Sequence, residues 1–436
     1  MNILSPNQDV MASEAPEDQE VHDDLAFVAE IFDNVRQMSV DVEGVSRPAY
    51  SEVETQTLAY LADVARREGL SVRYDAACNA VFSLPEDETA SEFIIVGSHA
   101  DSVPQGGNFD GLAGIVTGML CLVRARRAGH SFPVPVKVLA MRGEESAWFG
   151  PCYLGSKALT GTLKPQELAA FHKGDKRTLA EHMASVGVPI DEVKAGKPLM
   201  DLAQIKAYVE LHIEQGPLLV GKGLPAAVVS GIRGNIRFKG VKCIGEAGHS
   251  GAVPKAYRRD PVLAMADLLV RLDESWETIL NKGDDLVLTS GMVGTDPAKH
   301  ALSRIPDEVS FSLDIRSQSS ETLDEMRDLL KEETRQIERD RKVTFEFGPE
   351  ISTAPAMCAP DLVTQLQEAM THAGQKPFVM PSGAGHDAAV FAASGVPSAM
   401  VFVRNRNGSH NPAEAMDLDD FIAASDIVYE FLKRAS

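Results

Sequence analysis

The sequence predicts an α/β protein, in which a catalytic domain with a mixed, mainly parallel sheet and helices on both faces is interrupted by a smaller α+β domain. Two apolar stretches of strand length, residues 93–96 and 136–141, flank a helical pattern over about 112–127. This strand–helix–strand order is typical of parallel strands joined by crossover helices. At 436 residues, the chain is also longer than one hydrophobic core usually supports, which favours two domains.

Composition narrows the classes of partner. The formal charge of −21 (42 basic against 63 acidic residues) argues against non-specific binding to nucleic acid or to an anionic membrane, both of which need a basic face. It leaves room for a small anionic substrate. The five cysteines are scattered and form no CxxC pair, so they indicate free thiols. Without a signal-peptide pattern or an apolar stretch of membrane length, we expect a cytoplasmic protein.

The N-terminal half follows the pattern of the catalytic domain. Residues 1–24 are polar and acidic, and we expect them to form a mobile arm. A helical pattern covers 25–38, and Ser51 with Glu54 predicts a capping box at the start of a second helix that ends at Gly69. The strand-like stretches that complete this half are 72–74, 80–83, 93–96, 136–141 and 205–214.

After Pro217 the pattern changes to that of a split βαβ domain. We expect this smaller, ferredoxin-like domain over 219–350 and the catalytic domain over 25–218 and 351–436. Its strands are predicted at about 235–244, 286–293, 308–316 and 343–347, with helices at 261–272 and 321–337. The catalytic domain then resumes with a helix over 362–373 and a strand over 399–403.

Polar residues that suit metal ions follow several of the predicted strands. His99, Asp101 and Asp110 come after the first buried strand, and Glu144 and Glu145 come after the next. Each of these residues alone could simply cap a turn. Together they supply imidazole and carboxylate ligands at the carboxyl edge of a sheet, where α/β proteins place their ligands. His212, His386 and His410 follow later strands or glycine loops and extend the set.

This set is large enough for two divalent cations, which need a bridging carboxylate and roughly two further ligands each. Such a pair lowers the pKa of a shared water, while a free carboxylate nearby transfers the proton to a leaving nitrogen. The predicted chemistry is hydrolysis of an amide-like bond. Competing motifs, namely the GxSxG elbow, the P-loop, the dinucleotide fingerprint and HExxH, are absent from the sequence.

Seven blocks, in order, carry a family resemblance: GSHADSVPQGGNFDG, GEESAWFG, LHIEQGP, GEAGHSGAVP, FSLDIRS, SGAGHDA and GSHNPAE. They resemble the hydantoinase/carbamoylase family of metal-dependent amidohydrolases, which includes N-carbamoyl-L-amino acid hydrolases, allantoate amidohydrolases and β-ureidopropionases. The family is related to metal-dependent aminoacylases and carboxypeptidases. The resemblance extends from about residue 45 to residue 431. It implies two divalent metal ions per subunit, with zinc first and manganese, cobalt or nickel as alternatives.

The resemblance also implies roles for individual residues. The metal ligands would be His99 and His212 on one ion, Glu145 and His410 on the other, and Asp110 between them. Asp101 would orient His99, Glu144 would be the general base, and His249 would stabilise the oxyanion. The substrate would contact Gln215, Arg316, Gly385, His386 and the position of Ser303, with Arg316 binding its free carboxylate. The smaller domain would act as a lid and dimerisation surface, which implies a homodimer whose active sites are completed across the interface.

Two features depart from the family pattern. Ser303 stands where family members often carry Asn, so this contact to substrate is lost or replaced by Arg304. Trp148 and Tyr153, near the Glu144–Glu145 pair, are bulky. Both features bear on the substrate, not on the metal chemistry.

Three functions are therefore compared. The first is cleavage of the carbamoyl group from an N-carbamoyl amino acid or related ureido acid. The second keeps the same site but acts on an N-acyl amino acid or a dipeptide. The third is a catalytically inactive metal- or ligand-binding protein of this fold, against which the complete ligand set and Glu144 argue.

Overall fold

The structure, a computed structural model, describes residues 16–435 and divides the chain into two compact units. Unit 1 comprises Met1–Val228, Asp361–Val379 and Ser394–Ser436. Unit 2 comprises Val229–Pro360 and Met380–Ala393. The predicted insertion at 219–350 thus corresponds to unit 2 with later boundaries, and the short segment 380–393 joins unit 2 instead of the predicted catalytic domain.

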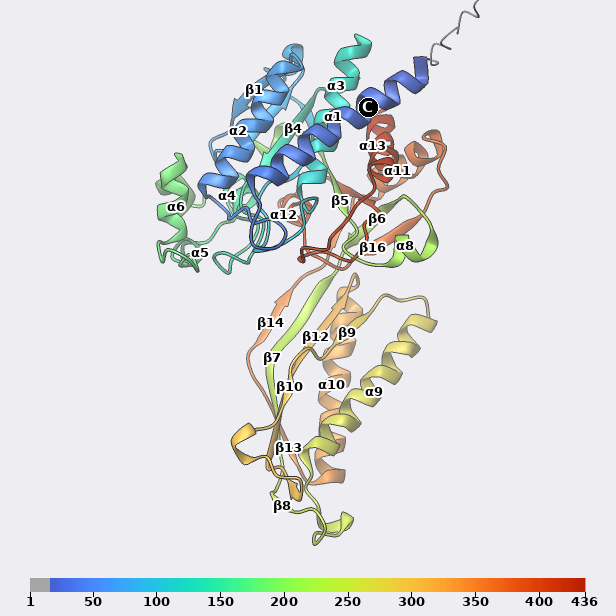
Figure 1. Cartoon of the computed structure of the whole chain (residues 1–436). Coiled ribbons are helices and arrows are strands. Elements are labelled where there is room, and N and C mark those ends of the chain that lie inside the picture. Colours follow the sequence, from blue (N-terminus) through green and yellow to red (C-terminus); the bar gives the residue numbers. More distant parts are fainter. Residues whose placement is uncertain (1–15, 436) are drawn as a thin grey trace, which may run out of the picture. The chain divides into compact units, whose positions relative to one another are not determined.

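Unit 1 is a mixed α/β structure around a mainly parallel sheet, as predicted (Figure 1). In the sheet that contains its strands, the order is β1-β2-β4-β3-β5-β17-β6-β15, with β16 beside β6. The central pairs β4–β3, β3–β5 and β5–β17 are parallel, whereas β1, β2 and β4 pair antiparallel. The helices and strands of unit 1 are α1 (Pro16–Met38), α2 (Glu52–Arg67), β1 (Ser71–Tyr74), β2 (Ala80–Ser83), β3 (Phe93–His99), α3 (Leu112–Ala128), β4 (Val136–Met141), α4 (Leu154–Thr160), α5 (Pro165–Leu168), α6 (Leu179–Val186), α7 (Ile190–Lys194), β5 (Ile205–Ile213), α8 (Leu218–Lys222), α11 (Pro360–His372), β17 (Ser398–Val403) and α13 (Leu418–Leu432), with β6 (Ala226–Ile232) and β16 (Val379–Ser382) at its boundaries.

Helix α3 lies directly against the central strands because glycines line its contact face. A Cβ atom on Gly114 would lie 2.3 Å from the Leu211 carbonyl oxygen of β5. Gly118 similarly faces Val138 of β4 at 2.8 Å. The helix starts after Gly111, whose φ of 69° is left-handed, and ends at Gly129 in the αL conformation. The chain between β3 and α3 is therefore drawn tightly over the carboxyl ends of β3 and β5.

Unit 2 has an antiparallel sheet with the order β10-β12-β7-β13, in which β14 also pairs with β7 and β9 with β12. Together with helices α9 and α10, the succession β7, α9, β9, β12, α10 and β13 is the split βαβ pattern of a ferredoxin-like fold. The elements of unit 2 are β7 (Gly234–Ile244), β8 (Gly248–His249), α9 (Pro261–Asn281), β9 (Val287–Thr289), β10 (Val293–Gly294), β11 (Arg304–Ile305), β12 (Glu308–Ser317), α10 (Ser320–Arg341), β13 (Thr344–Phe347), β14 (Glu350–Thr353), β15 (Ala356–Met357) and α12 (Asp387–Ala393).

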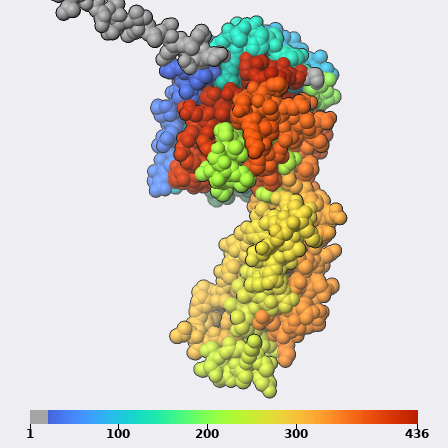
Figure 2. Space-filling model, turned by 90° about the vertical axis from the view of Figure 1, so that its right-hand side faces the viewer, coloured from blue at the N-terminus to red at the C-terminus, as the bar shows by residue number. Residues whose placement is uncertain are grey.

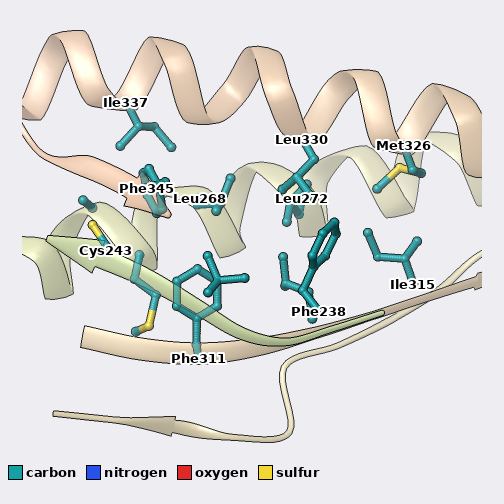
Figure 3. Packing of buried hydrophobic residues seen from close by; sticks show 14 of the residues in the cluster. Phe238, Cys243, Leu268, Leu272, Phe311, Ile315, Met326, Leu330, Ile337 and Phe345 are labelled. Atoms are coloured by element: carbon teal, nitrogen blue, oxygen red, sulfur yellow. The ribbon is translucent and has the colours of Figure 1, made fainter. Parts of the chain in front are cut away.

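The core of unit 2 lies between this sheet and the two helices (Figure 3). Every second residue of β12 is buried, as its alternating sequence predicts. Phe311 and Ile315 from β12 meet Leu268 and Leu272 from α9 and Leu330 from α10. The core therefore closes within unit 2.

The N-terminus differs from the expectation in two ways. Helix α1 begins at Pro16, inside the segment predicted to be a mobile arm; residues 1–15 lie outside the described residues. Its Asp24 is buried and accepts a hydrogen bond from Arg124 Nε at 2.7 Å, so this acidic residue is an ion-pair partner of α3. Ser51 caps α2 as predicted, but the Glu54 carboxylate bonds elsewhere, so only half of the capping box forms.

None of the helices within 16–435 combines the length and apolar character that crossing a membrane requires.

The core of unit 2 gives a stability prediction. Leu268→Ala deletes a fully buried side chain of α9 and should destabilise unit 2 by about 3–5 kcal/mol, because the cavity only partly collapses. The chain has two tryptophans, Trp148 and Trp276, and Trp276 of α9 packs against this core. In a Trp148→Phe background, urea-induced loss of Trp276 fluorescence should shift to lower urea for this variant.

The matched control is Val270→Ala in the same helix, at a residue that is 57% exposed. Part of α9 lies at the surface, in yellow, in Figure 2. This change should leave the urea midpoint within about 0.5 kcal/mol of its starting value. Equal shifts for both variants would contradict the packing described for unit 2.

Candidate metal centre

Two histidines from neighbouring parallel strands meet at one oxygen of Asp110. His99 ends β3, and its Nε2 lies 3.5 Å from Asp110 Oδ1. His212 belongs to β5, and its Nε2 lies 3.1 Å from the same oxygen. All three side chains are buried. The β3–α3 connection thus carries the Asp110 carboxylate back over the ends of the strands that bear the two imidazoles.

The other oxygen of Asp110 faces a second group. His410 Nε2 lies 3.5 Å from Asp110 Oδ2 and 3.2 Å from Glu145 Oε1. His410 comes from the loop after β17 and has a left-handed φ of 59°. Its side chain is 52% exposed, whereas Glu145 is buried. The structure therefore brings all five predicted metal ligands together around Asp110.

The donor separations fit divalent cations. In a tetrahedral site with bonds of about 2.0–2.2 Å, neighbouring donor atoms lie about 3.3–3.6 Å apart. The four contacts to Asp110 and Glu145 span 3.1–3.5 Å. They form two clusters, His99–Asp110–His212 and Asp110–Glu145–His410, which share Asp110. Imidazole and carboxylate donors suit zinc, manganese, cobalt and nickel, so the residues fit the predicted cofactor.

The electrostatics of the group favour positive charge. Although burial raises it, the pKa of Asp110 is held well below its usual range by His212 and His99. A hydrogen bond to Glu145 raises the pKa of His410 to about 9, against the effect of burial. Burial lowers the pKa of His99, but its contacts with Asp101 and Asp110 outweigh that effect and leave the pKa well above its usual range. Protons and metal cations compete for such a site.

Each buried imidazole has its second ring nitrogen fixed. His99 Nδ1 lies 3.2 Å from Asp101 Oδ1, and His212 Nδ1 lies 2.9 Å from the Ile213 carbonyl oxygen. These contacts turn Nε2 of both rings toward Asp110, as metal-binding histidines require. Gly111 makes room for His99, because a Cβ atom there would lie 2.4 Å from the imidazole ring.

Asp101 also holds the loop that bears Glu144 and Glu145. Its Oδ1 accepts a hydrogen bond from the Glu144 amide at 2.9 Å, and its Oδ2 accepts one from the Glu145 amide at 3.1 Å. The residue is fully buried. The Asp101 carboxylate therefore fixes the imidazole of His99. It also fixes the backbone of Glu144, the predicted base, and of Glu145, the predicted metal ligand.

Three supporting residues were not predicted from the sequence. Glu414 accepts hydrogen bonds from the amides of Phe109, at 2.8 Å, and Asp110, at 3.3 Å. Ser409 Oγ lies within hydrogen-bond distance of Asp110 Oδ2 and Glu414 Oε2 and can donate its single proton to either carboxylate. Both residues belong to the GSHNPAE block, in which the sequence predicted a role for His410 but not for Ser409 or Glu414.

The third is Arg47, a fully buried guanidinium that donates to the Ala100 carbonyl oxygen at 2.8 Å and to Asn108 Oδ1 at 3.0 Å. Burial lowers its pKa to about 10, opposed by nearby carboxylates that include Asp101. It ties together the two ends of the loop that carries Asp101 and leads to Asp110. An isolated arginine in a polar stretch gives no signal of this role in the sequence.

The predicted substrate contacts occupy three places. Gln215 of unit 1 donates its Nε2 to Asp110 Oδ2 at 2.7 Å, so it lies at the metal cluster. In unit 2, Arg316 of β12 pairs with Asp314 at 2.8 Å and donates to the Gly383 carbonyl oxygen at 2.6 Å. Gly385 and His386 follow β16, where His386 Nε2 lies 2.9 Å from Ser382 Oγ.

His249 and Ser303 lie together at the other end of unit 2. His249 of β8 pairs with Arg304 of β11, and the Ser250 amide donates to the Ser303 carbonyl oxygen at 2.8 Å. Both side chains are exposed. Arg316 instead pairs with Asn235 at the start of β7, whereas β8 follows the end of that strand.

Trp148, one of the two bulky residues near Glu145, is held by contacts within unit 1. Trp148 donates its indole Nε1–H to the Ser102 carbonyl oxygen at 2.8 Å, and its ring stacks on His172.

His172, Asp175 and His182 form a further cluster of metal-binding residue types. There, His172 Nδ1 already accepts the Gly174 and Asp175 amides at 3.2 Å, and His182 Nε2 lies 3.1 Å from Asp175 Oδ1.

The chain resembles known proteins over most of its length. Residues 95–434 match the model of peptidase family M20/M25/M40. The chain is 32% identical over 391 residues to an N-carbamoyl-L-amino-acid amidohydrolase of Pseudomonas sp. (strain NS671), covering 89% of this chain and 92% of that protein. It is 32% identical over 378 residues to the allantoate amidohydrolase of Escherichia coli (strain K12), covering 86% and 89%. A solved hydantoinase/carbamoylase family amidase from Burkholderia ambifaria aligns with a TM-score of 0.82 at 25% identity, covering 94% and 96%.

The geometry predicts which residue controls metal content. After loading with Zn²⁺ and desalting, the protein should retain about two ions per chain by elemental analysis. Asp110→Ala should lose most of both, because both clusters share this carboxylate, whereas Glu145→Ala should lose about one. His172→Ala, in the cluster whose donors are already hydrogen-bonded, is the matched control and should retain both. Full retention by Asp110→Ala would contradict the shared-ligand arrangement.

Proposed function

The chain belongs to peptidase family M20/M25/M40, and from this membership we propose that it cleaves the carbamoyl group from an N-carbamoyl amino acid or a related ureido acid. It is a hydrolase that acts on amide or ureido C–N bonds. The choice of a ureido substrate is supported by the names of its relatives, which include N-carbamoyl-L-amino-acid and allantoate amidohydrolases.

The observation that carries the proposal is the group around Asp110, with Glu144 beside it. The two clusters would hold a pair of divalent cations, and when bound these lower the pKa of a water and polarise a carbonyl group. Glu144 is buried, and its backbone is fixed next to Glu145 by Asp101. A carboxylate held in this way suits a general base that takes the proton from water and delivers it to the leaving nitrogen.

We assign the remaining steps to residues of this chain by their chemistry. His249 would donate a hydrogen bond to the oxygen on which negative charge develops. Arg316 would bind the free carboxylate of the substrate in a bidentate manner, exchanging its present ion pair with Asp314. Cleavage between the carbonyl carbon and the amino-acid nitrogen releases the amino acid, while the carbamoyl part ends as ammonia and carbon dioxide.

The arrangement within unit 2 supports a homodimer with shared active sites. Arg316 pairs with the start of β7 at Asn235, and β8 follows the end of β7 at Ile244 (Figure 1). The nine residue-to-residue steps from Asn235 to Ile244 along an extended strand span about 30 Å, which is longer than an amino-acid derivative. Arg316 and His249 of the same chain therefore cannot both contact one substrate. If both act, one of them comes from a second copy of the chain.

An N-acyl amino acid or dipeptide is the alternative substrate, and Ser303 is the observation that favours it. Its short hydroxyl stands beside β11, whose Arg304 pairs with His249. The family resemblance leads us to expect an amide side chain at this position. A serine lacks the paired donor and acceptor that would recognise a ureido group. Ammonia release from N-carbamoyl amino acids would support the first substrate class. Release of a carboxylic acid from N-acyl amino acids, without ammonia, would support the second.

The general base gives the next prediction. Glu144→Ala should keep its metal but lose about 10²–10⁴-fold in kcat, the usual contribution of a positioned base. Ammonia release from a panel of N-carbamoyl amino acids measures the rate, and elemental analysis of the same preparation controls for metal loss. Near-normal turnover by a metal-replete Glu144→Ala protein would reject this role.

If His249 is the residue that comes from the second copy, complementation is expected between two inactive variants. His249→Ala and Glu144→Ala chains, unfolded, mixed in equal amounts and refolded together, should recover about a quarter of the wild-type activity, because half of the dimers are mixed and one of their two sites is intact. The separately refolded variants are the control. Mixed dimers without activity would contradict sharing of His249.

A further inference from the structure

The peptide groups around Glu144 are hydrogen-bonded on both edges. On one edge, the amide of Gly143 donates to Glu54 Oε1 at 3.0 Å, and the amides of Glu144 and Glu145 donate to Asp101 at 2.9 and 3.1 Å. Three consecutive amides are thus bound by two buried carboxylates. Such charge-assisted bonds are stronger than ordinary backbone hydrogen bonds.

On the other edge, the start of α4 binds the carbonyl groups of the same segment. The amides of Tyr153 and Leu154 donate to the carbonyl oxygens of Glu144, at 2.8 Å, and Gly143, at 2.7 Å. The amide of Gly155 donates to the Arg142 carbonyl oxygen at 3.0 Å. The backbone that presents the proposed base is therefore fixed in its direction, not only in its position.

Glu54 reaches this segment from α2, 89 residues earlier in the sequence. Its side chain is fully buried. Instead of returning to its own helix cap, its Oε2 accepts the Tyr50 amide at 2.8 Å and Arg142 Nη1 at 2.7 Å. A glutamate at this helix position would ordinarily complete the capping box. Here its carboxylate instead accepts hydrogen bonds from Gly143 and Arg142, directly before the proposed base Glu144.

Stability alone is a weak reason for this arrangement. Burial raises the pKa of Glu54 to about 7, although Arg142 lowers it. A buried ion pair such as Glu54–Arg142 is often no more stabilising than apolar residues of similar volume. Orientation of the Gly143 amide, which donates to Glu54 Oε1, explains a buried carboxylate at this position better than stability does.

We propose that Glu54 is a positioning residue for the reaction, which holds the Gly143 peptide group so that Glu144 points at the attacking water. This inference rests on the proposed role of Glu144 as general base. Gly143 has a φ of 66°, and a Cβ atom there would lie 3.0 Å from the Tyr50 ring and 3.2 Å from Leu154. A glycine pivots easily, so the bond to Glu54 on one edge and the bond from Gly155 to the Arg142 carbonyl oxygen on the other together keep this peptide group in one orientation.

The test compares two substitutions at this position. Glu54→Ala removes the acceptor and should lower kcat about 10²-fold while KM changes little, because a displacement of about 1 Å of a catalytic group has an effect of this size. Glu54→Gln keeps an oxygen acceptor for the Gly143 amide and should retain kcat within about tenfold of wild type. An unchanged kcat in Glu54→Ala, or equal losses in both variants, would overturn the inference.

Two controls on the same helix separate positioning from general destabilisation. Glu52→Ala removes an exposed carboxylate from the same first turn, and should leave kcat unchanged. Leu58→Ala removes a fully buried side chain one turn later, and should lower the melting temperature while leaving kcat near wild type at 25 °C. A comparable loss of kcat in Leu58→Ala would show that Glu54 acts through stability, which contradicts the proposal.

A second readout does not depend on activity. Hydrogen–deuterium exchange of peptides covering 142–155 should show strong protection of the Gly143–Glu145 amides in the wild type. Glu54→Ala should lose this protection locally, whereas Leu58→Ala should not. Unchanged protection in Glu54→Ala would overturn the inference. If the wild type hydrolyses neither ureido nor N-acyl acids, the proposed function fails, and the exchange data still decide whether Glu54 orders this segment.

Discussion

Asp110 is a buried carboxylate whose two oxygens face imidazole nitrogens from three distant segments of the chain. A carboxylate in this environment needs positive charge beside it, because burial of an isolated charge is strongly unfavourable. Four further buried carboxylates surround it, namely Asp101, Glu144, Glu145 and Glu414. The buried guanidinium of Arg47 compensates only part of this negative charge. The cluster is thus organised to bind cations, and the surrounding loops are arranged to keep its donors apart at metal-binding distances.

Buried carboxylates also perform a second task in unit 1, which is to bind backbone amides. Asp101 fixes the amides of Glu144 and Glu145, Glu414 fixes the amide of Asp110, and Glu54 fixes the amide of Gly143. Loops are usually the mobile part of an α/β fold. Here the loops that carry the proposed ligands and the proposed base are bound at successive peptide groups, so that a precise site can be built on irregular backbone.

Much of the fold and of the candidate metal centre was predictable, because the ends of strands can be recognised from local sequence. The stretch at 93–96 and the alternation at 308–316 predicted β3 and β12, and the polar residues after the strands marked His99, Asp110, Glu145, His212 and His410. What could not be predicted depends on contacts between distant segments. Glu54 was predicted to complete a capping box, residues 16–24 were part of the predicted mobile arm, and no role was predicted for Arg47, because the partners of these residues lie far away in the sequence.

The central claim is that cations bind on both sides of Asp110. Anomalous diffraction at the zinc edge from crystals soaked in Zn²⁺ tests it most directly. The account predicts two peaks, one between Asp110 and the pair His99 and His212, and the other between Asp110 and the pair Glu145 and His410. Zinc at the His172–Asp175–His182 cluster with no peak beside Asp110 would contradict it.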